Sequence, residues 1–150
     1  MNEFKPFDDR LAGLIAALSP ASRRRMAADI AKTLRTRQQC RIKTQKAPDG
    51  TPYAARKRQP VRAKNGRVKR EMFAKLRTNR FMKASGRDDA AVVEFTGKVQ
   101  RIARVHHYGL KDKPGLNSEP VRYDVRPLLG FDKESFQLIE NAILIKLQES

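Results

Sequence analysis

The stretch VVEFTGKVQRIARVHHYGL, residues 92–110, changes its hydrophobic period half-way along and so decides the class of fold. Residues 92–96 place apolar and polar side chains on alternate sides, which is typical of a strand. From residue 98 onward the apolar positions recur after three or four residues, which is typical of a helix. Gly109 then stands where a C-capping glycine would end that helix. We therefore expect a strand followed directly by a helix at 98–109.

A second strand is expected just before this stretch. FMKAS, residues 81–85, also alternates, with Met82 and Ala84 on one side. RDDA, residues 87–90, has the composition of a turn. The segments 81–85 and 91–97 are therefore predicted to form a β-hairpin, and the fold is expected to mix strands with helices.

Two helices are expected nearer the N-terminus. The apolar residues of 8–18 share one helical face, and Ser19-Pro20 is typical of an N-cap followed by a first-turn proline. A second helix should then run over 20–44. Its apolar stripe repeats every fourth residue, through Met26, Ile30, Leu34, Gln38 and Ile42. Together the two helices predict a helical hairpin over 8–44.

The middle of the chain carries turn signals and positive charge. APDGTP, residues 47–52, is a predicted turn in which Asp49-Gly50 supplies the left-handed position and Pro52 prevents helix continuation. Residues 53–70 lack apolar periodicity, so 47–70 is expected to be a long basic loop. A short helix is predicted over 69–81, with its apolar face formed by Met72, Phe73 and Leu76.

The C-terminal part repeats the mixture of strand and helix. We expect a loop at 110–119, a strand at 120–125 and a connection at 126–131. Asp132 is predicted to cap a final helix over 133–148, whose inner face would hold Phe136, Ile139, Glu140, Ile143 and Leu147. The prediction is an α+β fold in a single domain, 1–150, with helices at 8–44 and an α+β core at 71–150.

Positive charge is concentrated in one block of the sequence. The formal net charge is +17, and residues 23–80 hold 20 of the 33 Lys and Arg with only three acids, Asp29, Asp49 and Glu71. Such a block favours polyanions or acidic protein surfaces. The residues expected to face a partner or DNA are Arg35, Arg37, Arg41, Lys43, Arg56, Lys57, Arg58, Arg62, Lys64 and Arg67.

The two histidines, His106 and His107, are poor candidates for catalysis or metal binding. Neighbouring residues on a helix point about 100° apart, so the pair cannot face one ligand, and metal-binding histidines on helices favour i, i+4 spacing. The single cysteine, Cys40, offers no zinc signature and fits a reducing compartment. We expect no enzyme activity, cofactor, metal or small-molecule substrate. His106 is predicted to be the more buried of the two, and replacement of His107 by alanine to be nearly silent.

Neither a signal segment nor a membrane span is expected. The N-terminal residues have no apolar run, and nowhere does the chain approach the roughly 18 consecutive apolar residues that a membrane helix needs. The protein is therefore expected to be located in the cytoplasm when it is first made.

Four motifs occur in order along the chain, and we call them the landmarks. They are PDGTP at 48–52, KREMFAKLR at 69–77, ARVHHYG at 103–109 and RPLLGF at 126–131. With these four motifs in this order, the chain resembles the phage virion morphogenesis family, the tail completion proteins of contractile-tailed bacteriophages. The landmark residues expected to have structural roles are Asp49, Gly50, Pro52, His106, Tyr108, Gly109, Arg126, Pro127 and Gly130.

This resemblance implies a fold and a role. It implies a small, mainly antiparallel sheet packed by helices, and a structural protein that completes the tail for head–tail joining. By wider analogy with neck and tail-terminator proteins, it implies an oligomeric ring, commonly a hexamer, that contacts other tail and head–tail connector proteins in the virion. Genomic DNA in the channel is a further expected contact. The competing interpretation from charge alone is a DNA-binding module that contacts the phosphate backbone.

Overall fold

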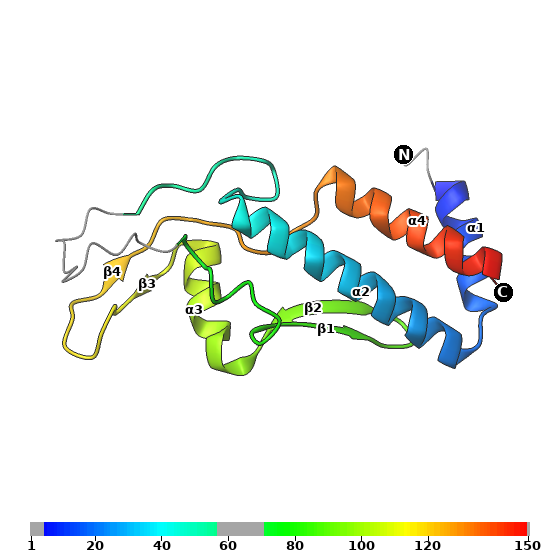
Figure 1. Cartoon of the computed structure of the whole chain (residues 1–150), viewed down its shortest axis with the longest axis horizontal. Helices are drawn as coiled ribbons and strands as arrows, with labels where there is room; N and C mark the ends of the chain where they lie inside the picture. The colour runs from blue at the N-terminus through cyan, green and yellow to red at the C-terminus, as the bar shows by residue number, and fades with distance from the viewer. Residues whose placement is uncertain (1–4, 57–70, 150) are drawn as a thin grey trace. The chain divides into compact units, whose positions relative to one another are not determined.

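The computed structural model describes residues 5–56 and 71–149. It confirms the α+β class (Figure 1). In chain order the elements are α1 (Lys5–Ala16), α2 (Pro20–Lys43), β1 (Met82–Gly86), β2 (Ala91–Phe95), α3 (Gly97–Tyr108), β3 (Lys111–Asp112), β4 (Val121–Arg122) and α4 (Lys133–Glu149). The strands form two two-stranded sheets, β1 with β2 and β3 with β4.

The described chain divides into two compact units. The first combines α1, α2 as far as Thr36, residues Lys83–Glu94 and α4, and the second combines Arg37–Met82 with Phe95–Asp132. Each unit thus joins segments that are distant in sequence. The single-domain organisation stays a prediction.

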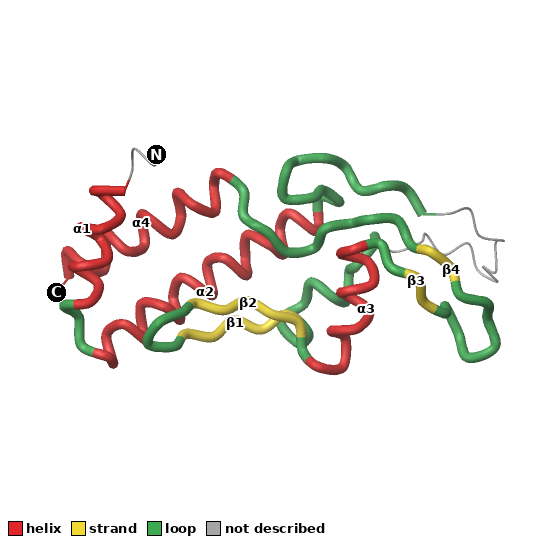
Figure 2. Tube along the Cα trace, turned by 180° about the vertical axis from the view of Figure 1, so that it is seen from behind, coloured by secondary structure: helices red, strands yellow, loops and turns green. Residues whose placement is uncertain are grey.

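The core of the first unit is built on the apolar stripe of α2. Met26, Ile30 and Leu34 are buried there, as the four-residue repeat predicted. The side chains packed against them come from α1 and the turn that follows it, from β2 and from α4, namely Ile15, Leu18, Ala91, Val93, Ile139, Ala142 and Ile143. Helix α2 therefore lies between α4 and the β1–β2 hairpin (Figures 1 and 2). The Ser19 hydroxyl accepts a hydrogen bond from the Ser22 amide, which confirms the predicted N-cap.

Gly86, at the end of β1, lies directly against the backbone of α2. A Cβ atom at this position would collide with the backbone nitrogen of Ala28 and would lie 2.6 Å from the carbonyl oxygen of Arg24. Only a residue without a side chain permits this approach of strand and helix. Gly86 therefore sets the distance between the hairpin and α2.

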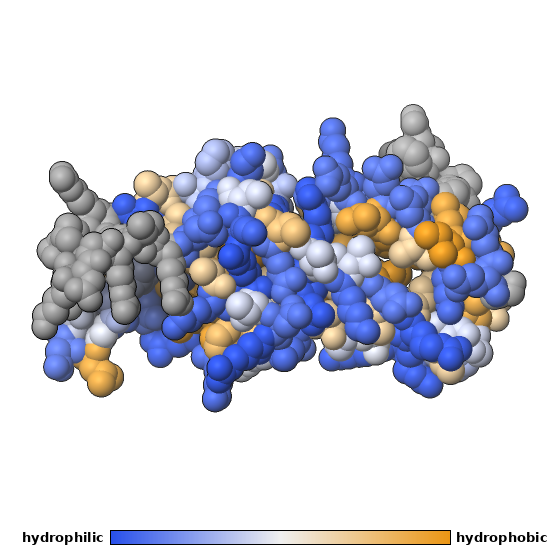
Figure 3. Space-filling model, viewed as in Figure 1, coloured by the Kyte–Doolittle hydropathy of each residue, from blue (hydrophilic) through white to orange (hydrophobic). Residues whose placement is uncertain are grey.

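The predicted inner face of α4 is partly wrong. Ile139 and Ile143 do pack on the core, but Phe136 and Glu140 are exposed, and the small residues Ser135 and Ala142 lie on the inner side instead. Apolar side chains consequently remain exposed in the first unit, namely Leu14 on α1 and Phe136, Leu144 and Ile145 on α4. Figure 3 shows apolar surface at the end of the molecule that α1 and α4 form.

In the second unit, α3 ends where the sequence predicted. Gly109 has φ 66° and ψ 50°, and its amide donates to the carbonyl of Val105. After this cap the chain runs back as the β3–β4 hairpin, in which Lys111 pairs with Arg122 and Asp112 with Val121. Beyond β4 the chain stays beside the end of α3, because the Tyr123 amide donates to the Leu110 carbonyl.

Two predictions for the second unit are wrong. The part of 69–81 that the structure describes forms successive turns and not a helix, because Phe73 adopts the left-handed conformation with φ 65°. The strand predicted at 120–125 is only two residues long, and its partner β3 lies in the expected loop. A two-residue pairing is too short to leave an alternating pattern in the sequence.

Candidate functional site

Three of the landmarks meet in the second unit. The Tyr53 hydroxyl, one residue after the PDGTP turn, donates to the Pro127 carbonyl at 2.7 Å. The Arg126 amide donates to the His106 carbonyl at 2.8 Å. A Cβ atom at Gly130 would lie 2.6 Å from Cγ of Pro48, so the RPLLGF segment also touches the turn. The PDGTP turn thus forms one cluster with two motifs that follow it by more than 50 residues in sequence.

Arg126 is the buried cation of this cluster. Its guanidinium donates to the carbonyls of Ala54 at 2.8 Å and Ala55 at 3.0 Å, and its Nη2 lies 3.6 Å from the carboxylate of Asp124. Only 5% of the residue is exposed. Five N–H donors in a rigid plane suit arginine to such a junction of backbone carbonyls. Arg126 therefore ties the chain after the turn to the RPLLGF segment.

Side chains near the C-terminal end of α2 also bind the RPLLGF segment. Arg41 Nη2 donates to the Leu128 carbonyl at 2.6 Å. Gln38 donates to the Gly130 carbonyl at 2.9 Å and accepts from the Gly130 amide at 3.3 Å. Arg37 pairs with Asp132 at 2.8 Å.

These contacts correct the expectation that α2 presents both arginines to a partner. Arg41 is only 6% exposed, and its guanidinium already donates to backbone carbonyls. Arg37 is engaged by a carboxylate of its own chain. Neither side chain is therefore counted among the outward-facing cations below.

The PDGTP turn has the predicted geometry. Gly50 has φ 87°, and the Asp49 carboxylate accepts a hydrogen bond from the Thr51 amide at 2.8 Å. That hydrogen bond lowers the pKa of Asp49. Burial raises the pKa of Tyr53 to about 12, so its hydroxyl stays protonated and remains a donor at neutral pH. Pro52, at the end of the turn, is exposed.

The two histidines have different structural roles. The His106 ring lies edge-on between Phe73 and Tyr123, with centroid distances of 5.1 and 4.8 Å. His107 Nδ1 accepts a hydrogen bond from the Leu128 amide at 3.0 Å. Both rings are partly buried, whereas Tyr108 is largely exposed. This hydrogen bond argues against the expectation that His107 contributes little, because it satisfies the amide of the fully buried Leu128.

Replacement of His107 by alanine is expected to lower the free energy of unfolding by about 1–3 kcal/mol, since the buried Leu128 amide loses its acceptor. Urea denaturation followed by circular dichroism would measure this. His107→Asn is the matched variant, because its side-chain oxygen can occupy the place of Nδ1 and recover part of the loss. An alanine variant as stable as the wild type would contradict the role of this hydrogen bond.

Stability should also depend on pH through both histidines. Burial lowers the pKa of His106 and of His107, and the nearby cations Arg126 and Arg41 lower them further. As the pH falls below about 6.5 the unfolded chain takes up protons before the folded one, so the stabilisation is complete above that pH and is lost below it. The melting temperature should therefore fall between pH 7.5 and about 5, where exposed carboxylates are still ionised.

The double variant His106→Phe/His107→Asn is the control for this pH dependence. Phenylalanine can keep the ring contacts of His106, and neither new residue titrates. Its melting temperature should change less with pH over the same range. Equal slopes for the variant and the wild type would show that other groups cause the dependence.

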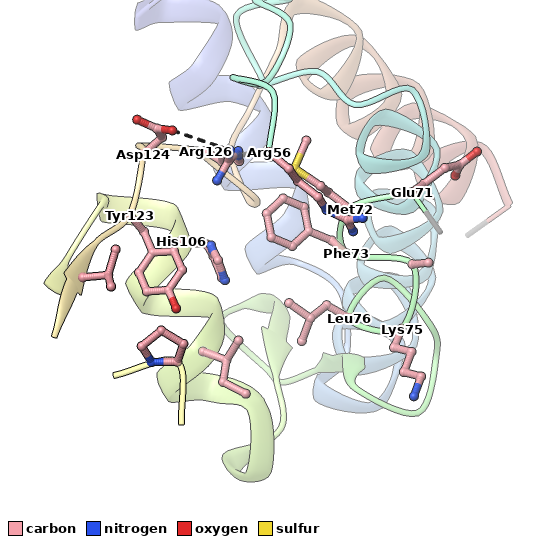
Figure 4. A pocket seen from close by; sticks show the side chains of 14 residues that line it. Arg56, Glu71, Met72, Phe73, Lys75, Leu76, His106, Tyr123, Asp124 and Arg126 are labelled. Carbon is pink, nitrogen blue, oxygen red and sulfur yellow. Dashed lines mark ion pairs between the residues drawn. The ribbon is translucent and has the colours of Figure 1, made fainter. Parts of the chain in front are cut away.

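A cavity of about 620 Å³ opens beside the three edge-on rings of Phe73, His106 and Tyr123 (Figure 4). Phe73, His106 and Tyr123 form one part of its wall, and the apolar side chains of Leu76, Ile102 and Val121 form much of the rest. The exposed residues Arg56 and Lys75 lie at its edge. It can bury apolar groups, but the described residues contain no group of three His, Cys, Asp or Glu able to hold a metal ion.

Several basic candidates remain on the surface of the described chain. Lys43 and Arg56 are exposed, and Arg35 is half-buried. The other five, Lys57, Arg58, Arg62, Lys64 and Arg67, lie outside the described residues. No helix among the described residues is long and apolar enough to cross a membrane.

Comparison with known proteins accounts for the order of the landmarks. A family model described as the phage virion morphogenesis family matches residues 2–148. The chain belongs to the phage virion morphogenesis family. It is 53% identical to tail completion protein S of Escherichia phage P2 over 149 residues, which are 99% of each chain. No solved structure matches.

Membership of the phage virion morphogenesis family confirms the resemblance and makes the chain a structural protein and not an enzyme. Sequence reasoning missed the residues that join the landmarks, above all Gln38, Arg41 and His107. Gln38 could have been found, because an amide on the apolar stripe of a helix needs a hydrogen-bond partner when buried. Nothing in the local sequence of Arg41 or His107 indicated their distant backbone partners.

Proposed function

We propose that this chain completes the tail of the phage that encodes it and prepares the tail for joining to the DNA-filled head. The observation that carries the proposal is the 53% identity with tail completion protein S, which extends over 99% of both chains. The protein would be made in the host cytoplasm and enter the virion at the tail end or neck, as a ring of identical copies, commonly six. Its partners would be tail and head–tail connector proteins.

The exposed basic residues, Lys43 and Arg56 among those described, are the part of the chain that would contact those partners. Lys43 and Arg56 are exposed, and no ion pair is formed by either within the described part of the chain. Cations at such positions favour an acidic protein surface or the phosphates of DNA passing through the channel. In contrast, the landmark cluster uses its polar groups internally and is expected to hold the fold.

Reversal of Arg56, Lys57 and Arg58 to glutamate should abolish head–tail joining and leave the melting temperature nearly unchanged. Arg56 is exposed and forms no ion pair with a described residue, so its reversal breaks no internal ion pair. The measurement is the plaque titre of phage carrying the triple variant. Replacement of the same residues by glutamine is the matched control, since it removes charge without reversing it. A wild-type titre for the glutamate variant would contradict the role of this surface.

The alternative function is a DNA-binding module, favoured by the net charge of +17 that residues 23–80 carry. Such a module would bind duplex DNA as a free protein, with an affinity that falls steeply as salt rises. A titration of labelled duplex at several salt concentrations separates the two functions. Tight, salt-dependent binding would favour the DNA-binding module, and its absence would favour docking on protein.

Electron microscopy of infected cells tests the main proposal. Phage with a stop codon early in this gene should yield filled heads and separate tails, and supplying the chain from a plasmid should restore joined particles. Joined, infectious particles in the absence of the chain would overturn the proposal.

A further inference from the structure

The turn that joins β3 to β4 presents one apolar side chain to solvent. The Ser118 amide donates to the Gly115 carbonyl at 3.2 Å, which closes a turn with Leu116 at its corner. Leu116 is 99% exposed, the highest value among the large exposed apolar residues. Pro114 and Pro120 flank the turn and restrict its backbone. The restricted backbone lowers the entropy that the turn itself loses when it binds.

The same unit contains a cavity of the matching chemistry. Its walls are largely apolar, and Ile102, which forms part of them, is 48% exposed. A volume of about 620 Å³ exceeds one leucine side chain and can accept Leu116 together with the adjacent turn. Figure 4 shows Phe73 and Tyr123 facing this space.

Leu116 does not occupy the cavity of its own chain. Pro114 and Val121, on either side of the turn, line the cavity, but Leu116 between them makes almost no contact with the protein. The projecting leucine and the cavity are thus adjacent but separate features of one molecule. Complementary surfaces that do not coincide give head-to-tail contacts, and such contacts close into rings when the rotation between copies permits.

Charge around the two surfaces is also complementary. Glu119 is exposed beside the turn, and Arg56 and Lys75 are exposed at the edge of the cavity. None of these three forms an ion pair with another residue in the ranges 5–56 and 71–149. The acids that line the cavity, Glu71 and Asp124, already pair with Arg77 and Arg126 of their own chain. The carboxylate of Glu119 would therefore meet the two unpaired cations at the edge, while the exposed Lys113 on the other side of the turn would have to point away from them, which favours one orientation of docking.

We propose that Leu116 of one copy inserts into the cavity lined by Phe73, Ile102 and Tyr123 of a second copy, and that this contact builds the ring. The occupant is a second copy of this chain, because the chain itself carries the projecting Leu116, the cavity and the complementary charges. The inference rests on the proposed function in so far as tail completion requires a ring.

Sedimentation velocity of purified variants tests the contact. Leu116→Glu removes the projecting apolar side chain without removing an internal contact. Ile102→Glu places a charge in the cavity wall at a half-exposed site. Each should weaken self-association by about tenfold or more relative to wild type. Their melting temperatures should stay near that of the wild type. Ile145→Glu is the matched control, because Ile145 on α4 is 58% exposed, close to the 48% of Ile102, and this variant should associate like wild type.

A mixture of the two variants gives the sharpest readout. Leu116→Glu keeps an intact cavity and Ile102→Glu keeps an intact leucine, so each pair can form one contact and no more. The mixture should therefore contain heterodimers and no larger species. Failure to form heterodimers, or association of Leu116→Glu equal to wild type, would overturn the inference. Loss of association in Ile145→Glu alone would overturn it too, and would assign the contact to α4.

These outcomes are separate from the failure of the proposed function. A wild-type protein that forms rings through another surface removes this contact and leaves tail completion intact. A wild-type protein that stays monomeric both alone and with tails overturns the contact and the ring together. Joined particles formed without the chain would overturn tail completion itself, whatever the purified protein does.

Discussion

Replacing Gly86 by alanine is expected to destabilise the protein by about 3 kcal/mol or more. The added Cβ would collide with the backbone nitrogen of Ala28 and lie 2.6 Å from the carbonyl oxygen of Arg24. Both obstacles are backbone atoms of α2, so no side-chain rotation can relieve the contact. The hairpin would have to move away from the helix, and the core around Met26 and Ile30 would open. Chemical denaturation of the purified variant measures the loss.

Gly13→Ala is the matched control for this prediction. Gly13 lies in α1 with no atom within 4 Å of an added Cβ. The same substitution there should be neutral or should stabilise by about 0.5–1 kcal/mol, because alanine favours the helix. If Gly86→Ala and Gly13→Ala unfold at the same urea concentration as the wild type, the close approach of β1 to α2 is wrong.

Gly109→Val is expected to have the second large effect, a loss of about 3 kcal/mol or more. Two causes add at this position. The backbone has φ 66°, which β-branched residues rarely adopt, and a Cβ atom would lie 2.6 Å from Val125 Cγ2 and 3.0 Å from the Tyr123 carbonyl oxygen. The substitution therefore opposes both the end of α3 and the chain that returns beside it. Thermal unfolding is the measurement.

Gly50→Val separates the two causes. Gly50 also has positive φ, 87°, but nothing lies within 4 Å of an added Cβ. Only the backbone strain should appear there, at about 1–2 kcal/mol. Equal losses at Gly109 and Gly50 would mean that the packing of Val125 on Gly109 contributes nothing.

The sequence predicted best the elements that depend on neighbouring residues. The four-residue stripe of α2, its Ser19 cap and the ending of α3 at Gly109 are all confirmed. Each follows from local geometry, because a helix face repeats every three or four residues and a left-handed end requires glycine. The turn at Asp49-Gly50 was predictable for the same reason.

What the sequence could not predict depends on contacts between distant segments. The pattern of 69–81 favoured a helix, but Phe73 takes a left-handed conformation and places its ring between Tyr53 and His106. The tertiary contact overrides the local preference. Arg41 was expected outside for a related reason, since its charge is visible in the sequence and its carbonyl partners are not.

In the candidate site, too, local sequence predicted some features, and others depend on contacts between distant segments. The landmark order indicated the correct family, but the landmarks proved to be parts of one structural cluster. Arg126 and Tyr53 join three of them, and the Phe73 ring brings the fourth against Tyr53 and His106. Leu116 carried no signal in the sequence, because a single leucine in a loop has no periodicity. Its exposure and the cavity became visible only in three dimensions.

The central claim is that this chain makes tails competent to join heads. The most direct measurement mixes filled heads with tails isolated from phage that lack the chain, and counts plaques before and after purified protein is added. The account predicts few plaques from heads and tails alone and a rise in titre that follows the amount of protein added, with no rise for the Arg56/Lys57/Arg58 reversal. A titre that is high without the protein, or that stays low with it, would contradict the account.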